Sequence, residues 1–195
     1  MVSALSDGAI GVPDPDQALY LIRPDGRLTT LHKGPFDGLA VDSTGKEFAI
    51  AESAGIGAPM GAPVHIIIAS LSSPGTTVSH TEPTPATSLL GWTTQGLLMS
   101  DSSRTWLWKP GTSSETEIPG VGNASVMLTD PGRLLVTVGQ PGAGVCLHPY
   151  TLSSRLMGPV LTCDMGNGWT VRPDGRRAVV GSTVFDLASG GPDRS

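Results

Sequence analysis

The chain has 195 residues, of which 38% are apolar and only 15% charged, and it carries 26 glycines, 17 prolines and a net charge of −5. This length allows one domain with a sizeable core, and so much glycine and proline favours short strands joined by tight turns over long amphipathic helices. The acidic balance, with only three lysines and no basic stripe, argues against binding to nucleic acid or to an anionic membrane.

Five turn glycines recur along the chain at near-even intervals, each between two short apolar stretches. They are Gly8, Gly45, Gly96, Gly132 and Gly175. A period of about 40 residues with several strands per repeat is typical of a β-propeller. We therefore expect a single all-β domain, a propeller of about five four-stranded blades, with approximate blade boundaries at 1–35, 36–84, 85–120, 121–164 and 165–195.

Alignment on these glycines predicts the strands in chain order. They are 2–5, 9–12, 19–22 and 27–31 in the first blade, 38–41, 48–51, 64–69 and 76–80 in the second, 88–92, 97–99, 106–108 and 115–118 in the third, 125–128, 134–138, 145–148 and 156–160 in the fourth, and 169–171, 178–180 and 184–187 in the fifth. The third strand of a blade is often apolar on both faces, which indicates a sheet packed between two neighbours. The fourth strand is polar, as expected of an exposed edge.

The fifth blade is expected to be incomplete, because the sequence indicates no fourth strand after 184–187. The tail contains Gly190, Gly191 and Pro192, which are poor strand formers, so we expect another chain to cover this apolar edge rather than the tail or the N-terminus. The sequence thus predicts a protein partner or self-association through the open edge of the last blade.

Two segments carry a resemblance to known propeller families. The sequence D-G-L-A-V-D-S-T-G at 37–45, followed by F-A-I-A-E, resembles the G-L-A-V-D-x-x-G repeat of NHL-type and SMP-30/gluconolactonase-type propellers. The sequence N-G-W-T-V-R-P-D-G-R at 167–176 is similar to the N-G-x-x-x-S-P-D-G-R segment of the second family. Together the segments cover about a tenth of the chain, and they imply a propeller fold rather than an activity.

The lactonase-like family implies a divalent cation on the propeller axis. Carried over residue by residue, its metal ligands correspond to Asp37 and Asn167, and Asn123 opens another inner strand that converges on the same axis. Oxygen ligands from several strands suit Ca²⁺ or another divalent cation. The alternative interpretation is that these three side chains cap turns, in which case no cofactor is expected.

A second candidate surface is the face where the loops between blades and between second and third strands emerge. Loops on a rigid scaffold usually carry function, so partner contacts are expected there. The candidate partner-binding residues are Asp14, Asp16, Glu52, Ser53, Gly57, Met60, Asp101 and Asp164. Ser53 also sits in a variant nucleophile elbow, but the prolines that follow it forbid the helix such an elbow needs.

The remaining chemistry-bearing residues are predicted to be structural. The four histidines have no metal-ligand spacing, and His65 and His148 fall inside apolar strands, where a hydrogen-bonded structural role is expected. The four tryptophans are expected to pack between blades. Counting along the hairpin places Cys146 opposite about residue 159 rather than Cys163, which predicts two free thiols and a reducing compartment.

Three functions are compatible with these features. The first and preferred one is a non-catalytic interaction or structural module, such as a subunit of a larger assembly, which makes an enzyme the less favoured interpretation. The alternatives are a metal-dependent lactonase-like hydrolase and a small-ligand sensor domain. No signal peptide or membrane span is apparent, so a cytoplasmic location or a place within a protein assembly is expected.

Overall fold

The computed structural model describes residues 2–5, 8–11, 18–52, 63–73, 77–82, 87–101, 103–121, 126–140, 142, 144–163, 169–172, 175–189 and 191–192. Within these ranges the chain forms twenty strands and no helix, and hence no helix able to cross a membrane. The strands are β1 (Val2–Leu5), β2 (Gly8–Gly11), β3 (Leu19–Ile22), β4 (Leu28–His32), β5 (Phe36–Val41), β6 (Glu47–Glu52), β7 (Val64–Ser70), β8 (Thr77–Glu82), β9 (Ser88–Thr93), β10 (Gly96–Ser100), β11 (Thr105–Trp108), β12 (Glu115–Glu117), β13 (Val126–Asp130), β14 (Arg133–Gln140), β15 (Gly144–Thr151), β16 (Leu156–Met157), β17 (Trp169–Val171), β18 (Arg177–Val180), β19 (Thr183–Asp186) and β20 (Gly191–Pro192).

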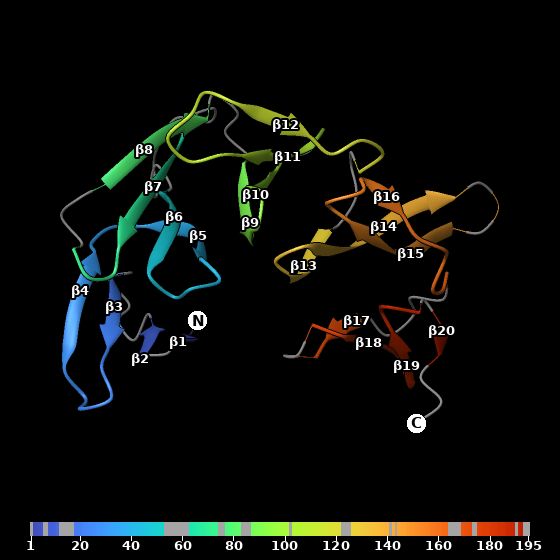
Figure 1. Ribbon diagram of the computed structural model, residues 1–195, viewed down its shortest axis with the longest axis horizontal. Coiled ribbons are helices and arrows are strands. Elements are labelled where there is room, and N and C mark those ends of the chain that lie inside the picture. The colour runs from blue at the N-terminus through green and yellow to red at the C-terminus, as the bar shows by residue number, and fades with distance from the viewer. Residues whose placement is uncertain are drawn as a thin grey trace.

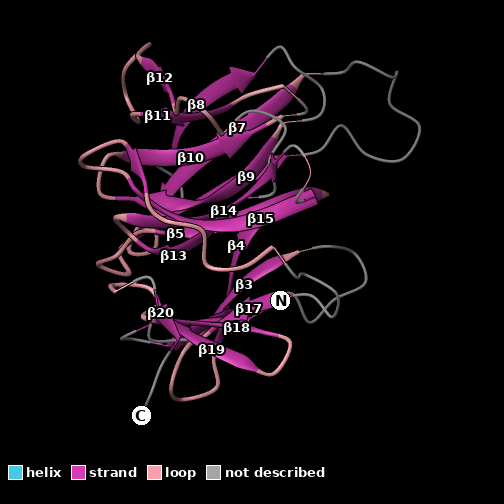
Figure 2. Ribbon diagram, turned by 90° about the vertical axis from the view of Figure 1, so that its right-hand side faces the viewer, coloured by secondary structure: helices cyan, strands magenta, loops and turns pink. Residues whose placement is uncertain are grey.

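The strands form five four-stranded sheets, each a meander of four consecutive strands. Figure 1 shows the sheets following one another in chain order around an arc, with the first strand of each toward the middle and the fourth at the outside. In Figure 2 the strands run across the view and the connections lie on two opposite sides. This is the expected all-β propeller architecture, and the predicted strands agree with the observed ones to within one to three residues at most ends.

Burial along the strands follows the predicted pattern. All four residues of β11 are buried, because this strand lies in a sheet that is covered on both faces. The outer strands are different: β4, β8 and β12 consist mainly of exposed or half-buried residues. The polar composition of these three outer strands therefore matches their place at the edge of a sheet.

Four apolar clusters lie between consecutive sheets, one at each interface. Leu19 of the first sheet meets Phe48 of the second, and Ile66 of the second sheet shares a cluster with Trp106 and Trp108 of the third. The third and fourth sheets share Leu107, Leu134, Tyr150 and their neighbours, and the fourth and fifth share Leu147, Ala178, Phe185 and Leu187. The predicted packing of tryptophans between blades is confirmed, since Trp92 and Trp169 also pack against these clusters.

Two of the predicted turn glycines are required for different reasons. Gly45 has a φ of +67° and donates its N–H to the Asp42 carbonyl, while the Asp42 carboxylate accepts the N–H groups of Lys46 and Glu47 at 2.8 Å each. Gly175 also has a positive φ, +66°, but in addition a Cβ there would overlap the carbonyl oxygen of Thr129 in the fourth sheet. Gly175 therefore serves both the turn and the packing of adjacent sheets.

The fifth sheet has a fourth strand, which corrects the prediction that the tail leaves its edge open. The two-residue strand β20 pairs Pro192 with Phe185 and Gly191 with Asp186. The chain reverses because the Asp186 carboxylate accepts the N–H groups of Ala188 at 2.9 Å and Ser189 at 2.7 Å. Proline is tolerated in an edge strand, where the missing N–H is not needed, so the expectation that the tail was the least suitable cover was wrong.

Cys146 and Cys163 form a disulfide, so the prediction of two free thiols was wrong. The pairing of Tyr150 with Met157 would place Cys146 opposite residue 161, but Leu147 pairs with Thr162. The register therefore shifts by two residues between Met157 and Thr162, which brings the two cysteine Cα atoms to 3.9 Å. The pairing also removes the argument for a reducing compartment, because disulfides persist in oxidising environments.

Candidate functional site

Of the three predicted metal ligands, only the backbone of Asp37 lies within the described residues. It is in β5, where the register to β6 shifts between Phe36 and Gly38. Asn123 and Asn167 lie outside the described residues. An axial cation site at these positions therefore stays a prediction.

Of the eight predicted partner-binding residues, two can be placed. Glu52 ends β6 and lies 3.6 Å from the Nε2 atom of His32, so it bridges the first and second sheets. Asp101 follows β10 and belongs to the polar cluster described below. The other six, Asp14, Asp16, Ser53, Gly57, Met60 and Asp164, lie outside the described residues.

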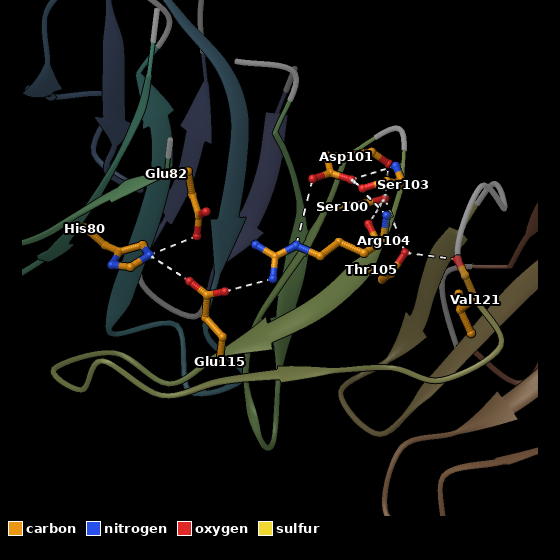
Figure 3. Close-up of polar contacts among 9 residues, drawn as sticks. All are labelled: His80, Glu82, Ser100, Asp101, Ser103, Arg104, Thr105, Glu115 and Val121. Carbon is orange, nitrogen blue, oxygen red and sulfur yellow. Dashed lines mark hydrogen bonds and ion pairs between the residues drawn. The ribbon is translucent and has the colours of Figure 1, made fainter. Parts of the chain in front are cut away.

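The densest group of polar side chains lies where the outer parts of the second and third sheets meet. We call it the inter-sheet cluster, and it consists of His80, Glu82, Asp101, Arg104 and Glu115. The Nε2 atom of His80 is 2.9 Å from Oε1 of Glu82 and 3.6 Å from Oε1 of Glu115 (Figure 3). Arg104 donates from Nη1 to Oε2 of Glu115 at 3.1 Å. Glu115 thus connects the histidine of one sheet to the arginine of the next.

Two tryptophan rings pack against the inter-sheet cluster. The His80 ring stacks on Trp108 with a centroid separation of 4.3 Å and an interplanar angle of 17°. The guanidinium carbon of Arg104 lies 4.2 Å from the centroid of the Trp106 ring. Both tryptophans are fully buried, and the Nε1 atom of Trp108 donates to the Thr112 carbonyl at 2.8 Å. These contacts therefore fix the orientation of the His80 ring and of the Arg104 guanidinium group.

Asp101 anchors the arginine through its own turn. Its carboxylate accepts the backbone N–H groups of Ser103 at 2.7 Å and Arg104 at 2.8 Å, and its Oδ2 lies 3.9 Å from Nε of Arg104 (Figure 3). Burial acts to raise the pKa of Asp101, but the hydrogen bonds from Ser103 and Arg104, together with the arginine charge, outweigh it and lower the pKa below its ordinary value. The Asp101 carboxylate thus holds its own turn and the arginine, and its contact with a partner stays a prediction.

Glu82 has the most unusual environment of the group. Its side chain is 0% exposed, and among the described residues its Oε2 atom has no hydrogen-bond partner, although Oε1 contacts His80. A buried carboxylate with an unsatisfied oxygen is costly unless a positive charge or a donor compensates it. This side chain is therefore the strongest indication that the inter-sheet cluster binds a cation or a hydrogen-bond donor.

The inter-sheet cluster was not predicted from the sequence. Glu115 is 33 residues from Glu82 and on another sheet, so no spacing rule relates the two. A local signal was present, since His80 and Glu82 are two apart in one strand and therefore project to the same face. The two histidines that were predicted to have a structural role do form hydrogen bonds, His65 with the Thr81 hydroxyl and His148 with the Gly158 carbonyl, each at 3.1 Å.

A second feature is apolar and lies on the outside of the fourth sheet. The outer apolar edge consists of Leu156, Met157 and Val160, whose exposed fractions are 66%, 36% and 42%. The segment from Leu156 to Thr162 contains no charged residue, unlike β8 and β12. A cavity of about 350 Å³ adjoins this edge and reaches Leu187 of the fifth sheet.

A larger cavity, of about 660 Å³, lies between the first and second sheets on the side of their turns. Charged side chains contribute to its lining, among them Arg23, Asp42 and Lys46. Its volume falls in the range of small-molecule sites. However, the Asp42 carboxylate is already engaged by the backbone of its own turn.

Comparison with known proteins establishes the fold. TolB from Acinetobacter baumannii is similar with a TM-score of 0.64 at 13% identity, over 96% of this chain and 51% of that one. A prolyl endopeptidase is similar with a TM-score of 0.67 at 15% identity, over 99% of this chain and 33% of that one. Dipeptidyl peptidase 4 from Porphyromonas gingivalis is similar with a TM-score of 0.51 at 10% identity, over 98% of this chain and 38% of that one.

The chain thus spans between a third and a half of the length of these similar proteins. At such low identity the likeness concerns the β-propeller fold and not an activity. No protein-family model matches the sequence. A search of curated proteins finds no match either.

Proposed function

We propose that the chain is a non-catalytic β-propeller interaction module whose copies associate through the outer apolar edge of the fourth sheet. The observation that carries this proposal is the exposure of Leu156, Met157 and Val160 within five residues at a sheet edge. Outer strands normally carry charged or polar residues that prevent pairing with another chain. An uncharged apolar edge is instead suited to contact with a protein.

A second copy of the chain is the occupant that we propose for this edge. The net charge of −5 makes copies repel each other, so association needs a surface without acidic residues. The segment from Leu156 to Thr162 meets that condition. Because β16 is an edge strand, two copies related by a twofold axis place the same strand against itself and satisfy the outward-facing backbone groups.

The described histidines also support a non-catalytic role. His32 and His80 contact glutamates across sheet boundaries, whereas His65 and His148 contact a hydroxyl and a carbonyl within their own sheets. Each imidazole therefore has a contact within or between sheets that a structural role would explain. Two of the proteins similar in fold are peptidases, and the chain covers 33% and 38% of their lengths.

Sedimentation velocity over a range of protein concentrations tests the proposal. We expect the wild type to show a concentration-dependent dimer, and Leu156→Lys to weaken it by placing a charge in the contact. Leu28→Lys is the matched control, because Leu28 is a similarly exposed leucine (57%) on the outer strand of the first sheet. A monomeric wild type up to 100 µM, or an equal effect of both substitutions, would contradict self-association through this edge.

One observation favours the small-ligand sensor as a second candidate. The cavity of about 660 Å³ between the first and second sheets combines apolar side chains with two basic residues, Arg23 and Lys46, and two acidic residues, Asp42 and Glu47, which suits a small polar molecule. The lactonase-like hydrolase, with Ca²⁺ or another divalent cation at Asp37, Asn123 and Asn167, is supported only by the resemblance of two segments to SMP-30/gluconolactonase-type propellers.

A further inference from the structure

The ligand atoms of His80, Glu82 and Glu115 converge on one point between the second and third sheets. One atom from each residue lies within 4.8 Å of the other two. In a tetrahedral zinc site, bond lengths of about 2.0–2.2 Å separate neighbouring ligand atoms by roughly 3.4 Å. The distances from His80 Nε2 to the two glutamate oxygens, 2.9 and 3.6 Å, lie on either side of that value. Small side-chain adjustments would therefore admit a cation.

The buried carboxylate of Glu82 supplies an independent reason for a cation. Its side chain is 0% exposed, and its Oε2 atom is without a hydrogen-bond partner among the described residues. The two oxygens of a carboxylate share one delocalised charge, so a cation bound to the group compensates both. His80 contacts only Oε1.

The charge of the inter-sheet cluster also favours a divalent cation. Glu82, Asp101 and Glu115 contribute three negative charges and Arg104 one positive charge, which leaves −2 when His80 is neutral. Bound Zn²⁺ would bring this sum to zero.

Neighbouring side chains already hold two of the three ligands, Glu115 (Figure 3) and His80, in place. Arg104 bonds Oε2 of Glu115 and leaves Oε1 directed to His80. Trp108 fixes the plane of the His80 ring by stacking. Such support from residues behind the ligands is a regular property of metal sites and contributes strongly to affinity.

We propose that His80, Glu82 and Glu115 form a site for Zn²⁺ or a similar first-row divalent cation that joins the second and third sheets. One imidazole with two carboxylates suits zinc, with water as a fourth ligand. Ca²⁺ is disfavoured, because it takes six to eight oxygen ligands. This site is on the outer part of the propeller, separate from the predicted axial position and from the outer apolar edge.

Isothermal titration calorimetry with Zn²⁺ on metal-free protein tests the proposal. We expect one Zn²⁺ per chain, and an affinity at least about tenfold weaker in His80→Gln and Glu82→Gln. His65→Gln is the matched control, because His65 is a strand histidine of the same sheet outside the cluster, and its affinity should equal that of the wild type.

Thermal unfolding separates metal binding from a purely structural role. Glu82→Gln removes a buried charge, so the metal-free variant should unfold at the same or a higher temperature than metal-free wild type. Added Zn²⁺ should raise the unfolding temperature of the wild type and His65→Gln but not of Glu82→Gln. If Glu82→Gln does not fold, Glu115→Gln, which changes a partly exposed side chain, serves the same purpose.

Two results would overturn the zinc site. One is a folded wild type that binds no Zn²⁺, which would mean that His80 only forms protein ion pairs. The other is Zn²⁺ binding that persists unchanged in His80→Gln and Glu82→Gln, which would place the ion elsewhere. Neither result bears on association through Leu156, because the two sites share no residue.

Discussion

Reduction of the Cys146–Cys163 disulfide is expected to cost about 3 kcal/mol of unfolding free energy, because the bond closes a loop between residues 17 apart and limits the entropy of the unfolded chain. In a chain of this size each kcal/mol corresponds to about 2–4 °C, so the unfolding temperature should fall by about 6–12 °C. The reduced wild type is the proper reference, since it keeps both side chains in place.

The assay is urea unfolding followed by the fluorescence of the buried Trp106 and Trp108, with and without a phosphine reductant. A double variant with Cys146→Ala and Cys163→Ala should resemble reduced wild type and should not respond to the reductant. Thiol titration of the denatured protein establishes the starting state. Two titratable thiols in protein purified under oxidising conditions, or an unfolding midpoint that does not move on reduction, would refute the two-residue register shift.

Three further predictions concern turns and the axis. Gly175→Ala should destabilise the protein by at least about 1 kcal/mol more than Gly181→Ala, because both have a positive φ but only Gly175 would also overlap Thr129; equal losses in thermal unfolding would contradict this. The lowered pKa of Asp101 means that its stabilising effect is complete above the ordinary aspartate pKa and is lost as the pH falls through the folded value. The unfolding free energy of Asp101→Asn should therefore fall less steeply than that of the wild type below about pH 4. The same pH dependence in both proteins would contradict this prediction. Asp37→Ala should abolish Ca²⁺ stabilisation if the axial site exists, whereas an unfolding temperature unaffected by Ca²⁺ or chelator in the wild type would remove that alternative.

Most of the strands were predictable because their signals are local. A turn such as 42–47 needs an aspartate and a glycine at fixed positions, and the flanking apolar residues then have to form strands. The repeat of this pattern gives the sheet order without any knowledge of distant contacts. The five sheets and their strand order follow from it, except for the fourth strand of the last sheet, which was not predicted.

The errors arose where one or two residues change the register. The count from the hairpin to Cys163 assumed uninterrupted pairing, whereas the pairing shifts between Met157 and Thr162. The fifth sheet was considered incomplete because Gly191 and Pro192 are poor strand formers, but Asp186 reverses the chain and two residues suffice. Both features depend on turn geometry that composition does not encode.

The inter-sheet cluster depends on packing between sheets. His80 and Glu82 are neighbours on one face of β8, but Glu115 joins them only because the apolar cluster between the second and third sheets, together with the stacking of Trp108 on His80, holds the two sheets in contact. Sequence spacing measures separation along a strand and not between two sheets. A site assembled from two blades therefore stays hidden until the blades are placed side by side.

The position of the apolar clusters has a consequence for unfolding. Each cluster joins only two consecutive sheets. In the described residues, folding cooperativity is therefore transmitted only between neighbouring sheets. Such nearest-neighbour coupling makes stability an approximate sum of unit and interface contributions. Substitutions that weaken the cluster between the second and third sheets would let the first two sheets unfold separately from the last three. Substitutions that weaken the first or the last cluster would instead let only one terminal sheet unfold. Hydrogen exchange should accordingly be slower in the second, third and fourth sheets, each of which has an apolar cluster on both sides, than in the first and fifth sheets.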